Sequence, residues 1–86
     1  MEGNKKSKTL DIKEDDIALW EALRACRKQL ASEQGIPPFM IFHDATLKEL
    51  LDNKPSTLAE LSNISGIGQK KLDKYGTEFL SVLNEI

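Results

Sequence analysis

The sequence has very few of the residues that build disulfides, metal sites and redox centres. Its 86 residues include one cysteine, Cys26, and one histidine, His43. A lone cysteine excludes an intramolecular disulfide, and with a lone histidine it does not complete the ligand set of a zinc site. We therefore expect no metal in this chain and a reducing compartment around it, the cytoplasm or the nucleus.

Long hydrophobic runs are absent as well. No apolar stretch approaches the roughly 18–20 residues that a membrane-spanning helix requires. The amino-terminal segment MEGNKKSKTLDIKEDD lacks the apolar core of a secretory signal peptide. Neither a membrane-bound nor a secreted protein is predicted.

An excess of positive charge is also missing. The chain carries 12 Lys and Arg against 14 Asp and Glu, a formal net charge of −2. The overall charge therefore predicts no tight electrostatic binding of nucleic acid or acidic lipid, although it allows a local basic patch. Charged residues of both signs make up 30% of the chain and hydrophobic residues 40%, which is typical of one small folded domain.

Helical periodicity dominates the chain after a polar start. Residues 1–14 predict a flexible linker or tail, and residues 15–86 predict a compact all-α bundle of about five short helices. The first helix starts at a cap from Asp15 or Asp16 and ends at Gly35, before two prolines that forbid its continuation. Its apolar face is predicted to contain Ile17, Leu19, Trp20, Leu23, Cys26 and Leu30.

Capping signals predict the starts of the next two helices. Asp44 is a suitable N-cap for the second helix, and Thr46 with Glu49 offers a capping box slightly later in register. The third helix is expected to start at Ser56 or Thr57, where Thr57 with Glu60 offers a second capping box. The predicted core positions of the later helices are Leu47, Leu50, Leu51, Leu58, Leu61, Ile64, Leu72, Tyr75, Phe79, Val82, Leu83 and Ile86.

No catalytic constellation is found among these residues. His43 neighbours Asp44 only in sequence, no serine nucleophile elbow exists, and the GIG triplet lacks the lysine and hydroxyl residues that end a phosphate-binding P-loop. Cys26 lies on the predicted apolar face of the first helix, where cysteine is typically a small buried residue and not a nucleophile. No catalytic residue, cofactor or enzymatic activity is predicted for this chain alone.

The first candidate site is the stretch ISGIGQKKLDKYG. Gly66 and Gly68 allow the backbone to approach a ligand closely, and the amides that open the following helix can bind a phosphate, with Lys70 and Lys71 one turn further on. An ordinary tight turn with solvated lysines explains the same spacing equally well. Gly76, inside the last helix, costs about 1 kcal/mol unless another helix packs close to it.

The second candidate site is the corner GIPPFMIF. Two prolines precede four large apolar residues, a run that fits neither face of an amphipathic helix and predicts a short 3₁₀ or helical turn. We expect Met40 or Ile41, with Phe42, to anchor this turn in the core, and Phe39 to stay outside as a stacking platform for a base. The alternative is that both phenylalanines are buried. Basic residues of the preceding helix are candidates for phosphate contacts: Arg24, Arg27 and Lys28.

Together these segments resemble the HRDC domain, the helicase and ribonuclease D C-terminal module. The resemblance covers residues 17–86 and is carried mainly by PPFMIFHDATL after the first helix and GIGQKKLDKYG at the start of the last. Within this family the sequence is most similar to the domain of bacterial RecQ-type DNA helicases, with ribonuclease D as the second choice. The resemblance implies a compact five-helix domain joined to an ATP-dependent motor, whose ATP and Mg would be cofactors of the parent protein.

The family also implies a ligand and a place in the cell. Weak binding of single-stranded or partly duplex DNA is expected, in DNA repair and recombination, by a monomeric domain in the nucleoid region of the bacterial cytoplasm. In RecQ relatives the position after the two prolines is a surface aromatic residue, usually Tyr, that contacts DNA. This position maps onto Phe39, which lacks the hydroxyl of Tyr.

The residues expected to bind nucleic acid are therefore Phe39, Arg24, Arg27, Lys28, Gly66, Gly68, Lys70 and Lys71. Two alternatives stay open at this point. One is a protein-interaction module, or one that docks onto other domains of the helicase. The other is an RNA-binding accessory domain, as in ribonuclease D.

Overall fold

The computed structural model describes residues 12–85, which form four α-helices and two short 3₁₀ helices and contain no β-strand. The elements are η1 (Glu14–Asp16), α1 (Ile17–Gln34), η2 (Pro38–Met40), α2 (Asp44–Asn53), α3 (Leu58–Leu61) and α4 (Gln69–Glu85). The predicted all-α class is confirmed, with four α-helices in place of about five. The predictions made for residues 1–11 and for Ile86 lie outside the described residues.

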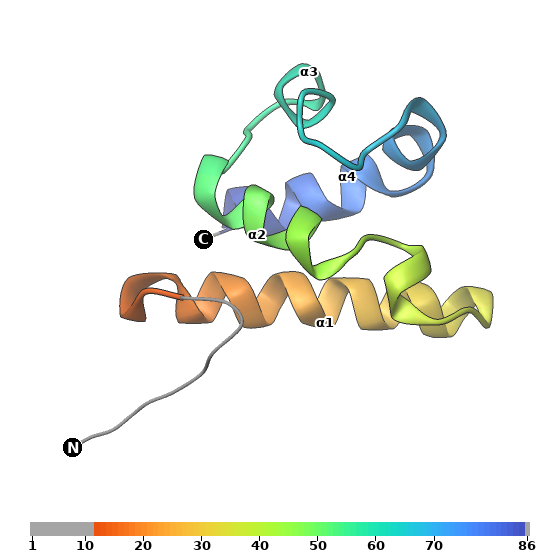
Figure 1. Ribbon diagram of the computed structural model, residues 1–86, viewed down its shortest axis with the longest axis horizontal. Coiled ribbons are helices and arrows are strands. Elements are labelled where there is room, and N and C mark those ends of the chain that lie inside the picture. Colours follow the sequence, from red (N-terminus) through yellow and green to blue (C-terminus); the bar gives the residue numbers. More distant parts are fainter. Residues whose placement is uncertain (1–11, 86) are drawn as a thin grey trace.

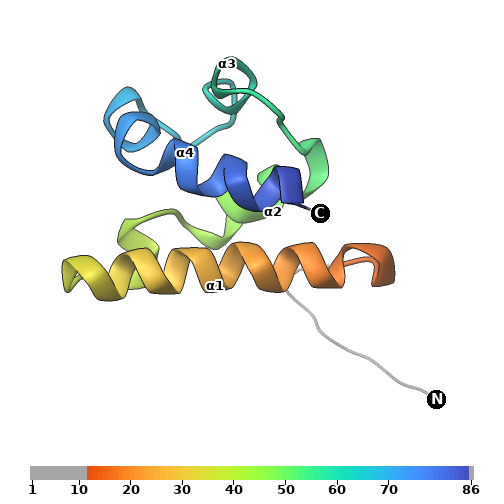
Figure 2. The same ribbon diagram turned by 180° about the vertical axis from the view of Figure 1, so that it is seen from behind.

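Helix α1 is the longest element, and the other helices lie along one side of it. Figure 1 shows α2 and α4 above α1, with α3 beyond α4, and Figure 2 shows the same arrangement from behind. α1 contacts α4, α2 and η2, while α3 contacts α4. In Figure 1, the turn that contains η2 lies over the right-hand end of α1, whereas the turn between α3 and α4 lies at the top of the molecule, beside α3.

The end of α1 follows from local chemistry. Gly35 adopts a left-handed conformation with φ of 68°, and its N–H donates to the carbonyls of Ala31 and Ser32. Glycine takes this conformation without the steric cost that a Cβ would bring. Pro37 then turns the chain away from the helix axis, so that η2 packs back against α1.

Asp16 occupies the N-cap position of α1, as predicted, whereas the predicted N-cap of α2 is wrong. Asp16 precedes α1, but its side chain makes no capping hydrogen bond, and its carboxylate pairs with Lys54 Nζ at 3.1 Å. His43, and not Asp44, precedes α2, and Thr46 lies buried inside that helix, so no capping box forms there. In both cases the carboxylate pairs instead with a cation that is distant in sequence. Asp16 pairs with Lys54, and Asp44 pairs with Arg27.

The predicted start of α3 is confirmed. Thr57 Oγ1 accepts a hydrogen bond from the Glu60 N–H at 3.1 Å. The Glu60 carboxylate in turn accepts the Ser56 N–H at 2.8 Å. Both acceptors satisfy amides at the helix start that have no partner within the helix.

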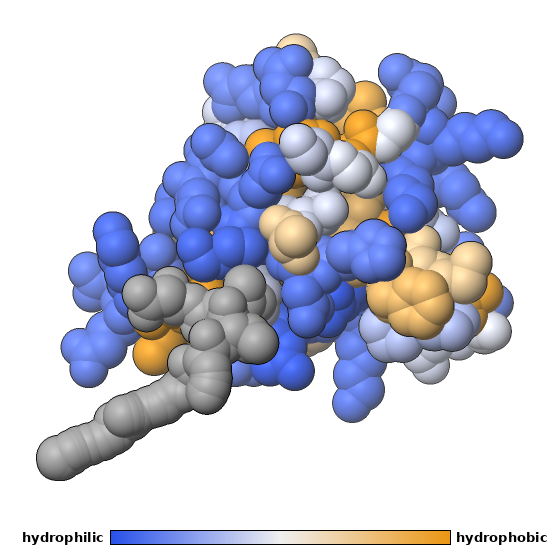
Figure 3. All heavy atoms as spheres, viewed as in Figure 1, coloured by the Kyte–Doolittle hydropathy of each residue, from blue (hydrophilic) through white to orange (hydrophobic). Residues whose placement is uncertain are grey.

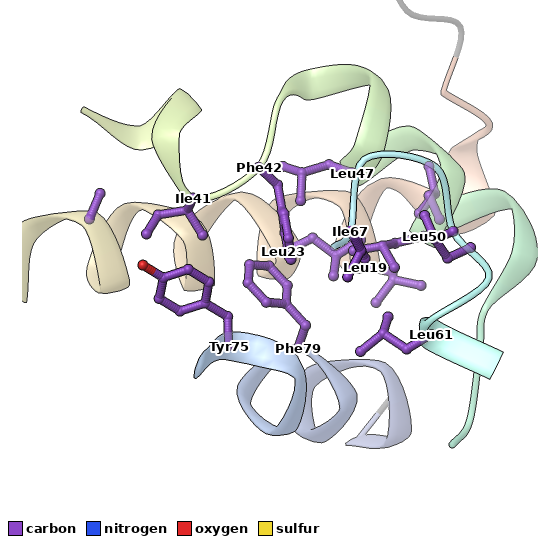
Figure 4. Close-up of a cluster of buried hydrophobic side chains, with 13 residues drawn as sticks. Leu19, Leu23, Ile41, Phe42, Leu47, Leu50, Leu61, Ile67, Tyr75 and Phe79 are labelled. Carbon is purple, nitrogen blue, oxygen red and sulfur yellow. The ribbon is translucent and has the colours of Figure 1, made fainter. Parts of the chain in front are cut away.

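The core lies between α1, α2 and α4. Figure 4 shows Ile41 and Phe42 pointing inward from the turn after α1, toward Leu23 of α1 and toward Tyr75 and Phe79 of α4. The Phe42 ring lies edge-on to Tyr75, with centroids 6.2 Å apart, and 4.9 Å from Phe79. The buried apolar residues are Leu19, Leu23, Ala31, Ile41, Phe42, Leu47, Leu50, Leu51, Leu61, Ile64, Ile67, Tyr75 and Phe79.

Two predicted apolar-face residues, Ile17 and Leu58, stay outside this core, with exposed fractions of 47% and 45%. Ile17 is the first residue of α1, and Leu58 is the first residue of α3, a helix of four residues that buries only Leu61. Leu58 instead covers Gly76: a Cβ built there would lie 3.0 Å from Leu58 Cδ2 and 3.3 Å from Leu61 Cδ2. Gly76 thus allows the close approach of α3 to α4 that its position predicts.

Candidate nucleic-acid interface

The segment between α1 and α2 exposes the Phe39 side chain to solvent and buries Ile41 and Phe42. Phe39 is 55% exposed and Met40 49%, whereas Ile41 and Phe42 are 0% and 1% exposed. The sequence leaves open whether Met40 or Ile41 anchors this turn in the core. The structure shows that Ile41 is buried and Met40 is not. In Figure 3, apolar side chains gather over this turn at the right-hand end of the face, with hydrophilic side chains around them.

Proline geometry and two hydrogen bonds hold this turn. The carbonyls of Pro37 and Pro38 accept the N–H groups of Met40 and Ile41, at 3.0 and 2.9 Å. The pyrrolidine rings restrict φ in the same segment. The backbone that carries Phe39 is therefore ordered before any ligand arrives, and a ring on it loses little conformational entropy on binding.

Arg27 stabilises the exit of the turn. Its guanidinium donates to the Phe42 carbonyl at 2.9 Å and pairs with the Asp44 carboxylate at 2.8 Å. The Arg27 side chain is only 12% exposed. This predicted phosphate ligand is thus bound to groups of its own chain, where it orients the segment behind Phe39.

The other two predicted cations of α1 lie nearer to solvent. A shallow pocket of about 380 Å³ is lined by Glu21, Arg24, Ala25, Arg27, Lys28 and Pro38. Arg24 pairs with Glu21 at 3.7 Å, and both side chains are more than half exposed, so the pair is weak and easily exchanged. The structure therefore brings Arg24 and Lys28 together with the proline corner that carries Phe39.

In the turn before α4, the first glycine, Gly66, is required by packing against α2. Gly66 has a φ of 88°, and a Cβ built on it would collide with Thr46 Oγ1 of α2. The Thr46 hydroxyl donates to the Ser65 carbonyl at 3.3 Å, and the Ser65 N–H donates to the Glu49 carboxylate at 3.4 Å. The close approach that Gly66 allows is thus made by α2 of the same chain.

Gly68 and Lys70 of this turn face outward, whereas Lys71 is partly covered. A Cβ built on Gly68 meets no atom within 4 Å. Lys70 is exposed, whereas Lys71 is partly buried and its Nζ lies 6.0 Å from the centroid of the Phe42 ring. Lys71 is therefore the residue of this turn that approaches the segment of Phe39.

His43 is a residue of this region to which the sequence assigns no role. Its ring stacks on that of Phe39, with centroids 5.9 Å apart and planes inclined by 28°. Three residues lie between the two in the chain, and the intervening turn is neither a regular α-helix nor a strand. No periodicity rule pairs such positions, so only the fold reveals the contact.

Cys26 has the chemistry of a structural thiol. It is partly buried against the core, beside a cavity of about 110 Å³ that Glu33 and Glu78 also line. Burial, followed by the charges of Glu78 and Glu33, raises the pKa of the Cys26 thiol to about 11. The thiol is protonated at neutral pH, and a protonated thiol is a poor nucleophile.

Neither a metal cluster nor a membrane span is found in the described part of the chain. No three His, Cys, Asp or Glu side chains within residues 12–85 are grouped so that they could hold a metal ion. None of the helices described is both long and apolar enough to cross a bilayer.

A family model described as the HRDC domain matches residues 16–83. The chain belongs to the HRDC domain family. Among curated proteins it is 48% identical over 73 residues to the ATP-dependent DNA helicase RecQ of Bacillus subtilis, and 39% identical over 70 residues to that of Haemophilus influenzae. These alignments cover 85% and 81% of this chain, but only 12% and 11% of the two helicases.

A solved structure of an HRDC domain has the same fold. The third HRDC domain of D. radiodurans RecQ superposes with a TM-score of 0.79 at 40% sequence identity, and the match covers 81% of this chain and 92% of that one. The predicted family and fold are thereby confirmed. The chain spans about an eighth of the curated helicases that it matches.

Proposed function

We propose that this chain is the auxiliary nucleic-acid-binding domain of a RecQ-type DNA helicase and that it contacts single-stranded or partly duplex DNA through the turn at Phe39. The observation that carries the proposal is the Phe39 ring, 55% exposed on an ordered turn. Arg24 and Lys28 line the adjacent pocket and would face phosphates. The names of the RecQ relatives supply the parent activity, which would use ATP and Mg elsewhere in a longer protein of the bacterial cytoplasm.

The proposed binding is weak, because few groups take part. Stacking of one base on an aromatic ring contributes about 1–3 kcal/mol, and two to four phosphate contacts add a modest electrostatic term. A dissociation constant of about 1 μM would require about 8 kcal/mol, so micromolar affinity or poorer is expected. Lys70, Lys71 and the backbone at Gly68 would extend the contacts along the strand, with Arg27 and Gly66 shaping the surface from behind.

A fluorescence-anisotropy titration with labelled oligo-dT tests the proposal. Phe39→Ala is expected to weaken binding by about 1 kcal/mol or more, because the stacked ring is lost. Met40→Ala is the matched control, since Met40 is the next residue and is 49% exposed but carries no ring. Equal affinity of wild type and Phe39→Ala would contradict the role of Phe39, and no binding of wild type at low salt would contradict the proposed function.

An alternative to nucleic-acid binding is docking onto a protein, and a pocket on another part of the surface favours it. A pocket of about 480 Å³ is lined by Glu49, Asn53, Pro55, Glu60, Asn63 and Ile64, an acidic surface that suits a basic protein segment better than DNA. If oligo-dT does not bind, this pocket is the first surface to test against the other domains of the helicase. A parallel titration with oligo-rU separates a preference for DNA from one for RNA.

A further inference from the structure

His43 lies beside Phe39 on the outer side of the turn that joins α1 to α2. The two ring centroids are 5.9 Å apart, and the planes are within 28° of parallel. Phe39 is 55% exposed, and His43 is exposed as well. The rings therefore form a stacked pair that faces solvent.

The backbone under both rings is held from within. Ile41 and Phe42, between the two rings in sequence, are buried in the core. The His43 carbonyl accepts hydrogen bonds from the Thr46 and Leu47 N–H groups, at 3.0 and 3.1 Å, where α2 begins. Because the segment is anchored on both sides, the ring pair has a defined place on the surface before any ligand is present.

The chemistry of the pair suits a nucleobase. Every base has a flat π face that stacks on an aromatic ring regardless of sequence. The imidazole adds a ring N–H donor and a ring nitrogen acceptor, which Phe39 lacks and which can reach the edge of a base. A base inside a duplex has both faces stacked and its pairing edge occupied, so only an unpaired base offers the surface that this pair can cover.

We propose that Phe39 and His43 together form a two-ring platform for one unpaired base of a single strand. The proposal rests on the proposed function and narrows it, because it makes the unpaired base, and not the duplex backbone, the recognised group. The strand would leave the platform past Pro38, which lies next to Phe39 and lines a pocket with Arg24 and Lys28. His43 thereby becomes a residue that contacts nucleic acid.

Three probes of equal length distinguish this platform from a general basic surface. They are a labelled oligo-dT of about 16 nucleotides, within the site size of small single-strand-binding domains, an abasic oligomer, and a blunt duplex. His43→Ala is expected to weaken binding of oligo-dT about fivefold or more, as the loss of a stacking ring does. Binding of the abasic oligomer and of the duplex should not change.

Two further variants complete the design. His43→Phe keeps a ring and is expected to restore most of the affinity for oligo-dT. Asn84→Ala, an exposed residue in the last turn of α4, should bind all three probes like wild type. Far-UV circular dichroism of each variant verifies that the helices are retained.

The results separate the platform from the function on which it rests. If Phe39→Ala weakens binding and His43→Ala does not, the proposed function stands and the platform is wrong. If His43→Ala weakens all three probes equally, the histidine contacts the backbone and the platform is wrong. If His43→Phe fails to restore binding, His43 does not act as a stacking ring and the platform is also wrong. If wild type binds none of the probes, the proposed function itself fails.

Discussion

Arg27 and Arg24 lie one turn apart on α1 and differ sharply in their surroundings. The Arg27 guanidinium, 12% exposed, holds the Phe42 carbonyl and the Asp44 carboxylate. Arg24 is 52% exposed and forms one long ion pair with Glu21. The same residue type, three positions apart, thus stabilises the fold in one case and faces solvent in the other.

Arg27→Ala is expected to lower the free energy of unfolding by about 1–3 kcal/mol, because the mutation leaves a partly buried carbonyl without its charged donor. Arg24→Ala should change stability by less than about 0.5 kcal/mol, as most exposed positions do. Urea denaturation of both variants measures the difference. A loss of stability in Arg27→Ala as small as that expected for Arg24→Ala would show that the contacts of Arg27 contribute little.

The Cys26 thiol provides a test that depends on pH. Burial raises its pKa from 9.0 to about 11. In folded protein near pH 9.0 it should therefore react with iodoacetamide much more slowly than in protein unfolded in urea. Equal alkylation rates in the two states would contradict the raised pKa.

The raised pKa of Cys26 also determines how stability changes with pH. Between pH 9.0 and about 11 the unfolded chain has lost the Cys26 proton and the folded chain keeps it. The contribution of this group to stability is therefore complete below pH 9.0 and is lost as the pH rises through that range. Cys26→Ser serves as the control. Lysines also titrate in this pH range, and the difference between the stability profiles of wild type and Cys26→Ser gives the contribution of the thiol alone.

The turn between α3 and α4 packs against helix α2. Thr46 of α2 lies against Gly66, and the Thr46 hydroxyl binds the Ser65 carbonyl. Of the two explanations of the GIG triplet that the sequence leaves open, packing accounts for Gly66. Gly68, with open space around it, stays a candidate for close approach of a phosphate.

The two glycines of this turn should therefore respond differently to alanine. Gly66→Ala combines a collision with Thr46 and a φ of 88°, so a loss of about 1–3 kcal/mol is expected. Gly68→Ala should be close to neutral for stability, because its Cβ would meet no atom within 4 Å. Thermal unfolding of the two variants in parallel checks this, and equal melting temperatures would contradict the packing of Thr46 on Gly66.

The charge of the whole molecule makes the salt dependence of binding informative. With a net charge of −2, the long-range field of the domain does not attract a polyanion. In the proposed interface, attraction would come from local cations such as Arg24 and Lys28, which line the pocket beside Pro38. The proposed electrostatic contact with DNA would therefore depend on where these cations lie and not on the overall composition.

A shallow salt dependence is therefore predicted. Each phosphate contact with a single strand contributes a slope of about −0.7 in a plot of log K against log salt concentration. Two to four contacts give a total slope between about −1.4 and −2.8. Titrations of oligo-dT at several salt concentrations measure the slope, and Lys28→Ala should make it shallower by about one contact. A slope steeper than about −5 would indicate a larger basic surface than the fold provides.

Much of this protein was predictable from residues close together in the chain. The all-α class follows from apolar spacings of three and four, the end of α1 from Gly35 and the prolines, and the start of α3 from Thr57 and Glu60. The exposure of Phe39 and the burial of Phe42 follow from the rigid proline corner. Each of these features depends on groups within about one helical turn of one another, so the local sequence contains both partners.

Other features were decided only when distant segments packed together. Asp16 pairs with Lys54 and makes no capping hydrogen bond at its own helix end, and Arg27 donates to the Phe42 carbonyl on the far side of the turn. The packing of Thr46 on Gly66 joins residues 20 positions apart. The fold selects such partners because the packing of the helices brings together groups that are distant in sequence, and no pattern along the chain records where those segments meet.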